Sequence, residues 1–209
     1  MKLRSDSFND GDFLPIQYAF GKRSAEGQIE LSDNRNPHFA WSDLPQGTKS
    51  IVLLCIDRDV PTKPDDVNQV GRVVPADLPR TDFSHWVLVD VAPTATVVEG
   101  DYCDGVTAKG KDGPEGPHGS RQGINDYTGW FASDPEMAGD YYGYDGPCPP
   151  FNDSIVHHYR FTVYALDVER LGVDGKFTSE DVQSAMDGHV LGQASMIAKY
   201  TINADAKEQ

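Results

Sequence analysis

The chain has 209 residues, of which 38% are hydrophobic and 24% charged, and this suits one globular domain spanning residues 1–209. The formal net charge of −15 repels nucleic acid, so we expect no nucleic-acid partner. No apolar run is long enough to span a bilayer, so we expect no stable membrane insertion. The three cysteines form no CxxC pair and residues 1–8 contain no apolar leader, which favours a cytoplasmic protein with reduced thiols.

Short apolar segments separated by turns fill the first half of the chain. Twenty glycines and 14 prolines provide the turns, and this composition favours β structure. Residues 51–56 form a continuous apolar run of strand length, which predicts a central strand buried on both faces. An acidic segment, 57–61, follows this strand and places Asp57 at its end.

A long irregular loop is expected at residues 62–80, and a second strand at 83–91. Alternation along that strand places His85 on the same apolar face as Val87 and Val89. A third strand, residues 156–166, has His157 and Tyr159 on its apolar face. Histidines therefore enter apolar faces on two predicted strands.

One helix is expected near the C-terminus. Thr178 and Asp181 have the spacing of a helix N-terminal capping box, and apolar residues continue at helical spacing as far as Val190. A closing strand is expected at residues 196–202.

A rigid loop of glycine and proline, residues 144–150, lies just before the third strand. We expect Asp57, His85, His157 and Tyr159 to meet beside this loop. The backbone N–H groups near Gly146 would complete a shallow pocket of hydrogen-bond donors. Such a pocket suits a small anion, because imidazole and phenol donate to phosphate or carboxylate oxygens.

Six sequence blocks together resemble the phosphatidylethanolamine-binding protein family, and most of all its bacterial branch, often called Raf kinase inhibitor-like. The resemblance covers roughly residues 8–202. The blocks are NPHFAW at 36–41, DRDVP at 57–61, SHW at 84–86, GINDY at 123–127, GPCPP at 146–150 and HHY at 157–159.

The resemblance implies a mainly β fold: two antiparallel sheets in a Greek-key, sandwich-like arrangement, with one C-terminal helix before a final strand and long loops. It also implies a pocket for phosphate or phospholipid head groups. The implied ligand-binding residues are Asp57, His85, Gly146, Pro149, Pro150, His157 and Tyr159. The implied supporting residues are Asp59, Pro61 and Trp86.

The chain departs from the family pattern in three places. Arg58 stands where the family usually has proline. His158 stands where the family commonly has arginine, and strand alternation predicts that the His158 side chain points away from the pocket. Residues 128–142 are an insertion with four aromatic side chains, which suggest packing, a dimer contact or a lid.

The leading hypothesis is a non-enzymatic binding protein for a small anionic group, without a cofactor or metal. One alternative is an inhibitor of a kinase or protease that acts by protein contact. Another is a hydrolase or metal-dependent enzyme, since two histidines and a carboxylate also suit acid–base or metal chemistry. The bacterial branch that the chain resembles leads us to expect a homodimer.

Overall fold

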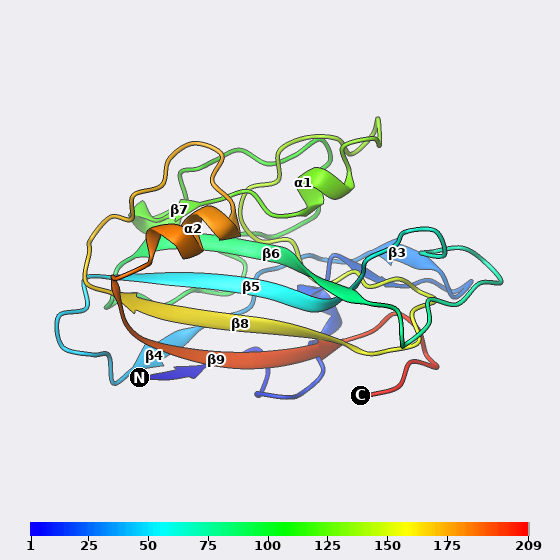
Figure 1. Cartoon of the computed structure of the whole chain (residues 1–209), viewed down its shortest axis with the longest axis horizontal. Helices are drawn as coiled ribbons and strands as arrows, with labels where there is room; N and C mark the ends of the chain where they lie inside the picture. Colours follow the sequence, from blue (N-terminus) through cyan, green and yellow to red (C-terminus); the bar gives the residue numbers. More distant parts are fainter. Residues whose placement is uncertain (209) are drawn as a thin grey trace.

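The computed structural model describes residues 1–208, and its largest element is a five-stranded antiparallel sheet (Figure 1). The strand order is β7-β6-β5-β8-β9. The bounds of these strands are β5 Ser50–Pro61, β6 Arg80–Val91, β7 Arg121–Gln122, β8 His157–Leu166 and β9 Val190–Tyr200. As predicted, an irregular segment, residues 62–79, joins β5 to β6.

The central strand β5 is buried on both faces, as its apolar run predicts. Leu53 and Cys55 pack into the main hydrophobic core on one face of the sheet. Val52 and Leu54 pack into a second cluster on the other face. The strand continues through the acidic segment to Pro61, so Asp57 lies within β5 and not after its end.

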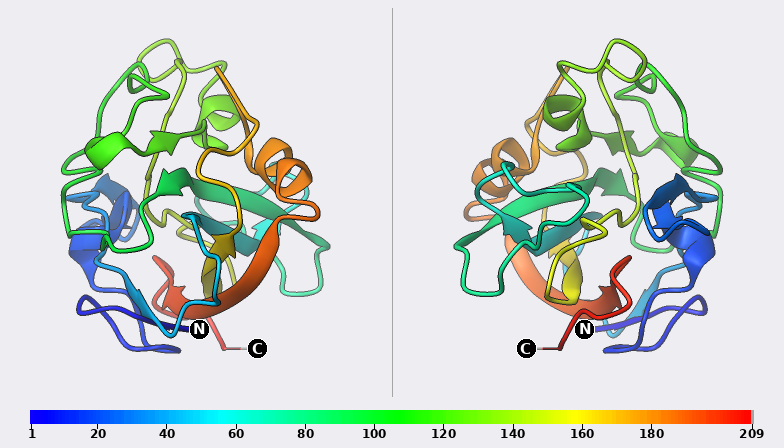
Figure 2. Two further views of the ribbon diagram at one scale, coloured as in Figure 1. Left: turned by 90° about the vertical axis from the view of Figure 1, so that its left-hand side faces the viewer. Right: turned by 90° about the vertical axis from the view of Figure 1, so that its right-hand side faces the viewer.

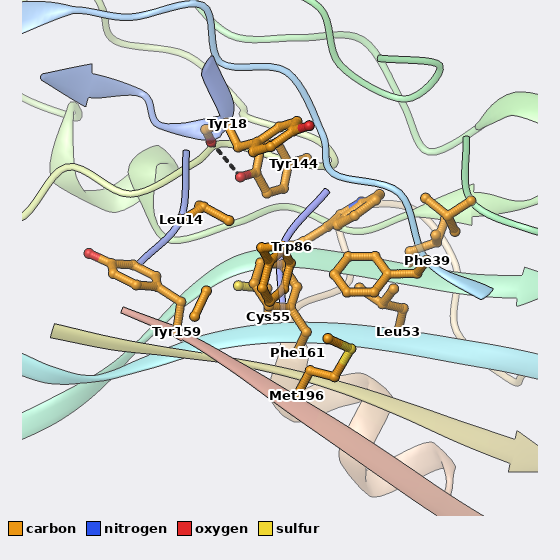
Figure 3. Packing of buried hydrophobic residues seen from close by; sticks show 14 of the residues in the cluster. Leu14, Tyr18, Phe39, Leu53, Cys55, Trp86, Tyr144, Tyr159, Phe161 and Met196 are labelled. Carbon is orange, nitrogen blue, oxygen red and sulfur yellow. Dashed lines mark hydrogen bonds between the residues drawn. The ribbon is translucent and has the colours of Figure 1, made fainter. Parts of the chain in front are cut away.

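The main core lies between the sheet and the N-terminal third of the chain. Phe39, Trp86 and Phe161 are fully buried there, and the hydroxyl of Tyr144 donates to the carbonyl of Tyr18 (Figure 3). The covering layer holds two two-stranded sheets, β1-β4 and β2-β3, and the short helix η1. Their bounds are β1 Lys2–Arg4, η1 Ile16–Tyr18, β2 Gly21–Arg23, β3 Ile29–Leu31 and β4 Ala40–Ser42.

The mainly β, antiparallel fold class is therefore confirmed. The second layer is divided into two small sheets because turns interrupt residues 1–50 after every few apolar residues. The remaining short helices lie in loops, η2 at Pro117–Gly119 and α1 at Tyr127–Trp130. No helix within residues 1–208 has the length and apolar character needed to cross a membrane.

The opposite face of the sheet is covered by α2, Ser179–Ala185 (Figure 2). Val182 and Met186 pack against the side chains of β5 and β6 there. The predicted capping box is present, with reciprocal hydrogen bonds between Thr178 and Asp181. The helix is shorter than its apolar spacing predicts, because Gly188 turns the backbone with a φ of 77° and Val190 already belongs to β9.

The middle of β6 departs from regular alternation. Cys55 pairs with Trp86, whereas the next residue of β5, Ile56, pairs with Ser84. His85 is thus an extra residue in β6, as in a β-bulge. Its ring contacts that of Tyr159 on the main-core side, whereas Val87 and Val89 pack beneath α2. The predicted shared face of His85, Val87 and Val89 is therefore wrong.

Candidate functional site

A cavity of about 630 Å³ opens beside the ends of β5, β6 and β8. It brings together six of the seven ligand-binding residues expected from the sequence, and one of the three supporting residues. These are Asp57, His85, Pro149, Pro150, His157 and Tyr159, with the supporting residue Pro61.

Gly146 lies outside this lining and its backbone is already hydrogen-bonded. Its N–H donates to Asn34 Oδ1 at 2.8 Å, and its carbonyl accepts from the Tyr127 hydroxyl at 2.8 Å. The N–H of Asp145 is also used, by the carbonyl of His85. The expectation that the N–H of Gly146 itself faces the ligand is therefore wrong. A side chain at this position would meet the carbonyl of Tyr18 at 2.0 Å, which explains the glycine.

Two expected supporting residues lie outside the cavity. Trp86 is fully buried in the main core, where its Nε1 donates to Gln122 Oε1 at 3.0 Å. Asp59 accepts hydrogen bonds from the backbone N–H and the ring of His158, at 2.8 and 2.9 Å. Its own N–H donates to Asp57 Oδ1 at 2.8 Å, so Asp59 helps to hold Asp57. His158 does not line the cavity.

Two of the residues that line the cavity, Asp57 and His157, belong to a chain of four charged groups that runs away from it. His157 bridges two carboxylates, through Nδ1 to Asp57 at 2.7 Å and through Nε2 to Asp153 at 3.1 Å. Asp153 also pairs with Arg80 at 2.6 Å. We call these four residues the charge chain. Asp153 and Arg80 were missed by the sequence analysis, because both lie in segments without a recognisable motif.

The charges in this chain stabilise one another. Burial favours the neutral imidazole of His157, but the two carboxylates outweigh it and raise the pKa to about 9. Burial also opposes ionisation of Asp57, but the charge and the hydrogen bond of His157 hold the pKa of Asp57 below its ordinary value. The same holds for Asp153, whose pKa is lowered by His157 and Arg80 against the effect of burial. The signs alternate, so the charge chain is neutral as a whole.

His85 and Tyr159 remain able to bind a ligand. His85 donates from Nδ1 to the carbonyl of Asp145 at 2.8 Å, which leaves Nε2 as the nitrogen that can accept a proton. Burial lowers the pKa of His85 and keeps the ring neutral. Burial and, after it, the neighbouring carboxylate of Asp57 raise the pKa of the Tyr159 hydroxyl. This hydroxyl is buried and forms no hydrogen bond of ordinary geometry within residues 1–208. In Figure 3 it points away from Trp86 and Phe161.

Most of the remaining cavity wall is apolar. The segment 128–142, expected to be an insertion, contributes Trp130, Phe131 and Met137. Its other two aromatic side chains, Tyr141 and Tyr142, are buried. This segment therefore both packs against the domain and forms one wall of the cavity.

The cavity also contains Cys148, whose thiol is poorly suited to nucleophilic chemistry. Its apolar surroundings raise the pKa to about 12, so the thiolate is scarce at neutral pH. Among residues 1–208, no group of three or more His, Cys, Asp or Glu side chains is arranged to hold a metal ion. The two nitrogens of His157 are already engaged by carboxylates.

Comparisons with known proteins agree over nearly the whole chain. The family model for phosphatidylethanolamine-binding proteins matches residues 4–201. The chain is 32% identical over 201 residues to the UPF0098 protein YbhB of Escherichia coli, covering 96% of this chain and 100% of YbhB. It is also 32% identical over 200 residues to a UPF0098 protein of Methanothermobacter thermautotrophicus, covering 96% and 98%.

Two crystal structures share the fold. One is the phosphatidylethanolamine-binding protein homologue CT736 of Chlamydia trachomatis, with a TM-score of 0.62, 27% identity and 95% of each chain covered. The other is YbcL of Escherichia coli, with a TM-score of 0.66, 24% identity and coverage of 96% and 97%. Together with the match of the family model, these similarities show that the chain belongs to the phosphatidylethanolamine-binding protein family.

Proposed function

We propose that this protein is a non-enzymatic binding protein for a small anionic group, such as phosphate, phosphorylethanolamine or a phospholipid head group. The observation that carries the proposal is the Tyr159 hydroxyl, which is buried, lines the cavity and has no partner within residues 1–208. A buried hydroxyl without a partner costs free energy that a ligand oxygen would recover. His85 lies beside it, with ring centroids 5.0 Å apart.

The charges of the site select the protonation state of this anion. The charge chain is neutral overall, and neither lysine nor arginine is among the cavity-lining residues. Tyr159 donates a hydrogen bond, whereas the neutral ring of His85 accepts one at Nε2. This pair fits a group that has both an anionic oxygen and an O–H, as a singly protonated phosphate ester does. A doubly charged ligand would take up a proton when it binds.

A purely binding role is also supported by the chemistry of the lining. Cys148 is the one thiol in the cavity, and its raised pKa disfavours the thiolate. No serine lines the cavity in the described part of the chain. His157, which could otherwise transfer protons, is held between two carboxylates.

A calorimetric titration with phosphorylethanolamine and with inorganic phosphate tests this proposal. We expect wild-type protein to bind, and Tyr159→Phe to weaken binding about tenfold, since one hydrogen bond to a charged group contributes about 1.5 kcal/mol or more. His85→Ala should weaken binding further. Titration in buffers of different ionisation enthalpy should show proton uptake for a dianion. Absence of binding to wild-type protein would refute the proposal.

A further inference from the structure

The cavity is much larger than the anionic group that its polar end can bind. Its volume of about 630 Å³ lies within the range of roughly 300–1,000 Å³ that drug-sized ligands occupy. Liquid water takes about 30 Å³ per molecule, so a bare phosphate fills only a small part of this space. His85 and Tyr159 account for one end of the cavity only.

Most of the rest of the cavity is walled by aromatic and aliphatic side chains. Phe20, Tyr127 and Phe131 form a stack with neighbouring ring centroids at 4.7 and 5.5 Å. At the mouth, Trp130 is 49% exposed and Leu31 is 56% exposed, although both line the cavity. Large apolar side chains left in contact with water around one cavity are typical of a surface that a ligand covers.

We propose that the ligand joins its anionic group to one compact apolar substituent, a ring or a short chain, which packs against Trp130, Phe131 and Met137. This inference rests on the proposed function, because the anionic end is held by His85 and Tyr159. The polar and the apolar residues line a single cavity, so one ligand can contact both. Residues 128–142 thereby determine which esters bind.

The ligand is a soluble ester and not a bilayer lipid. The net charge of −15 repels anionic membrane surfaces, and none of the residues that line the mouth is lysine or arginine. The same head-group chemistry occurs in phospholipids, so the experiment has to separate the two sources.

The test is a calorimetric series on the full chain with inorganic phosphate, methyl phosphate, butyl phosphate and phenyl phosphate. Burying one methylene contributes enough to tighten binding about fourfold, so affinity should rise steadily from methyl to butyl phosphate. Trp130→Ala should weaken phenyl phosphate at least fivefold and leave phosphate unchanged. Trp130 is half exposed, so this variant should fold normally. Leu31→Ala is a second variant at the same mouth.

The matched control is Phe13→Ala. Phe13 is 50% exposed, like Trp130, but does not line the cavity. Its loss should leave all four affinities unchanged. A parallel arm measures cosedimentation with vesicles of phosphatidylethanolamine and phosphatidylcholine.

The outcomes separate this inference from the proposed function. If phosphate binds but the organic esters bind no more tightly, the apolar subsite is refuted and the anion site stands. If neither the soluble phosphate compounds nor the vesicles bind, the proposed function fails. Binding to vesicles but not to soluble esters would overturn the inference in favour of a membrane lipid. A gain from methyl to butyl phosphate that Trp130→Ala reduces would support it.

Discussion

Two buried tyrosine hydroxyls differ in their hydrogen bonding, and we expect them to differ in their contribution to stability. The hydroxyl of Tyr144 donates to the carbonyl of Tyr18, whereas that of Tyr159 has no partner within residues 1–208. Both rings are fully buried. Tyr159→Phe should therefore leave the free energy of unfolding unchanged or raise it, whereas Tyr144→Phe should lower it by about 1 kcal/mol. Urea unfolding of the two variants measures this. A clear loss of stability in Tyr159→Phe would mean that its hydroxyl serves the fold.

The charge chain makes stability depend on pH. The pKa of His157 is raised from 6.5 in the unfolded chain to about 9, so its contribution is complete below pH 6.5 and is lost as pH rises through 9. The shift corresponds to a loss of about 3 kcal/mol across this window. The lowered pKa values of Asp57 and Asp153 add stability above their unfolded pKa, which is lost in acid.

Asp153→Asn tests this assignment. The variant should be less stable throughout, because it removes one partner of a buried ion pair. It should also lose less stability between pH 6.5 and 9, because one of the two carboxylates that raise the pKa of His157 is gone. Urea unfolding at several pH values gives the slope. Equal slopes in wild type and variant would contradict the role of Asp153.

At the level of elements, the loop before β8 depends on a close backbone contact. A Cβ atom on Gly146 would lie 2.0 Å from the carbonyl of Tyr18, so the loop or η1 would have to move. Gly146→Ala should lower the free energy of unfolding by about 1–3 kcal/mol, as overpacking does. Gly172→Ala is the control, because no atom lies within 4 Å of its Cβ position. Thermal unfolding compares the two, and equal melting temperatures would contradict this account.

The long elements were predictable because their patterns are local. The apolar run of β5, the alternation of β8 and the capping box of α2 each lie within about ten residues of sequence. The bulge at His85 was not predictable from local sequence, because it depends on the register between β5 and β6. In that register Cys55 pairs with Trp86 and Ile56 pairs with Ser84. The family resemblance therefore placed His85 correctly in the cavity although the alternation argument did not.

The polar part of the site was predictable as a set of residues but not as a set of hydrogen bonds. Motif matching identified Asp57, His157 and Tyr159, yet only the fold shows that His157 is fully engaged and that Tyr159 is free. Asp153 and Arg80 come from loop and strand ends that carry no motif. The apolar wall depends on how residues 128–142 fold back on the domain.

At the scale of the whole molecule, the excess of acidic side chains acts against the compact state. A net charge of −15 causes self-repulsion that salt screens, with a Debye length of about 8 Å at 0.15 M. The melting temperature at pH 7 should rise when NaCl is increased from 10 to 150 mM. Near the isoelectric point of about 4.6 the same addition should have little effect. A melting temperature that falls with salt at pH 7 would show that attractive ion pairs dominate.

The homodimer and the cytoplasmic location stay predictions.

The position of Cys148 provides an internal reporter for ligand discovery. Cys55 and Cys103 are buried, whereas Cys148 is half-buried and lines the cavity. A small alkylating reagent should therefore modify this thiol first, and slowly, because its pKa is about 12. Any compound that fills the cavity should protect it. Mass spectrometry of the intact protein can thus screen a metabolite library by footprinting, without any assumption about which molecule the cavity holds.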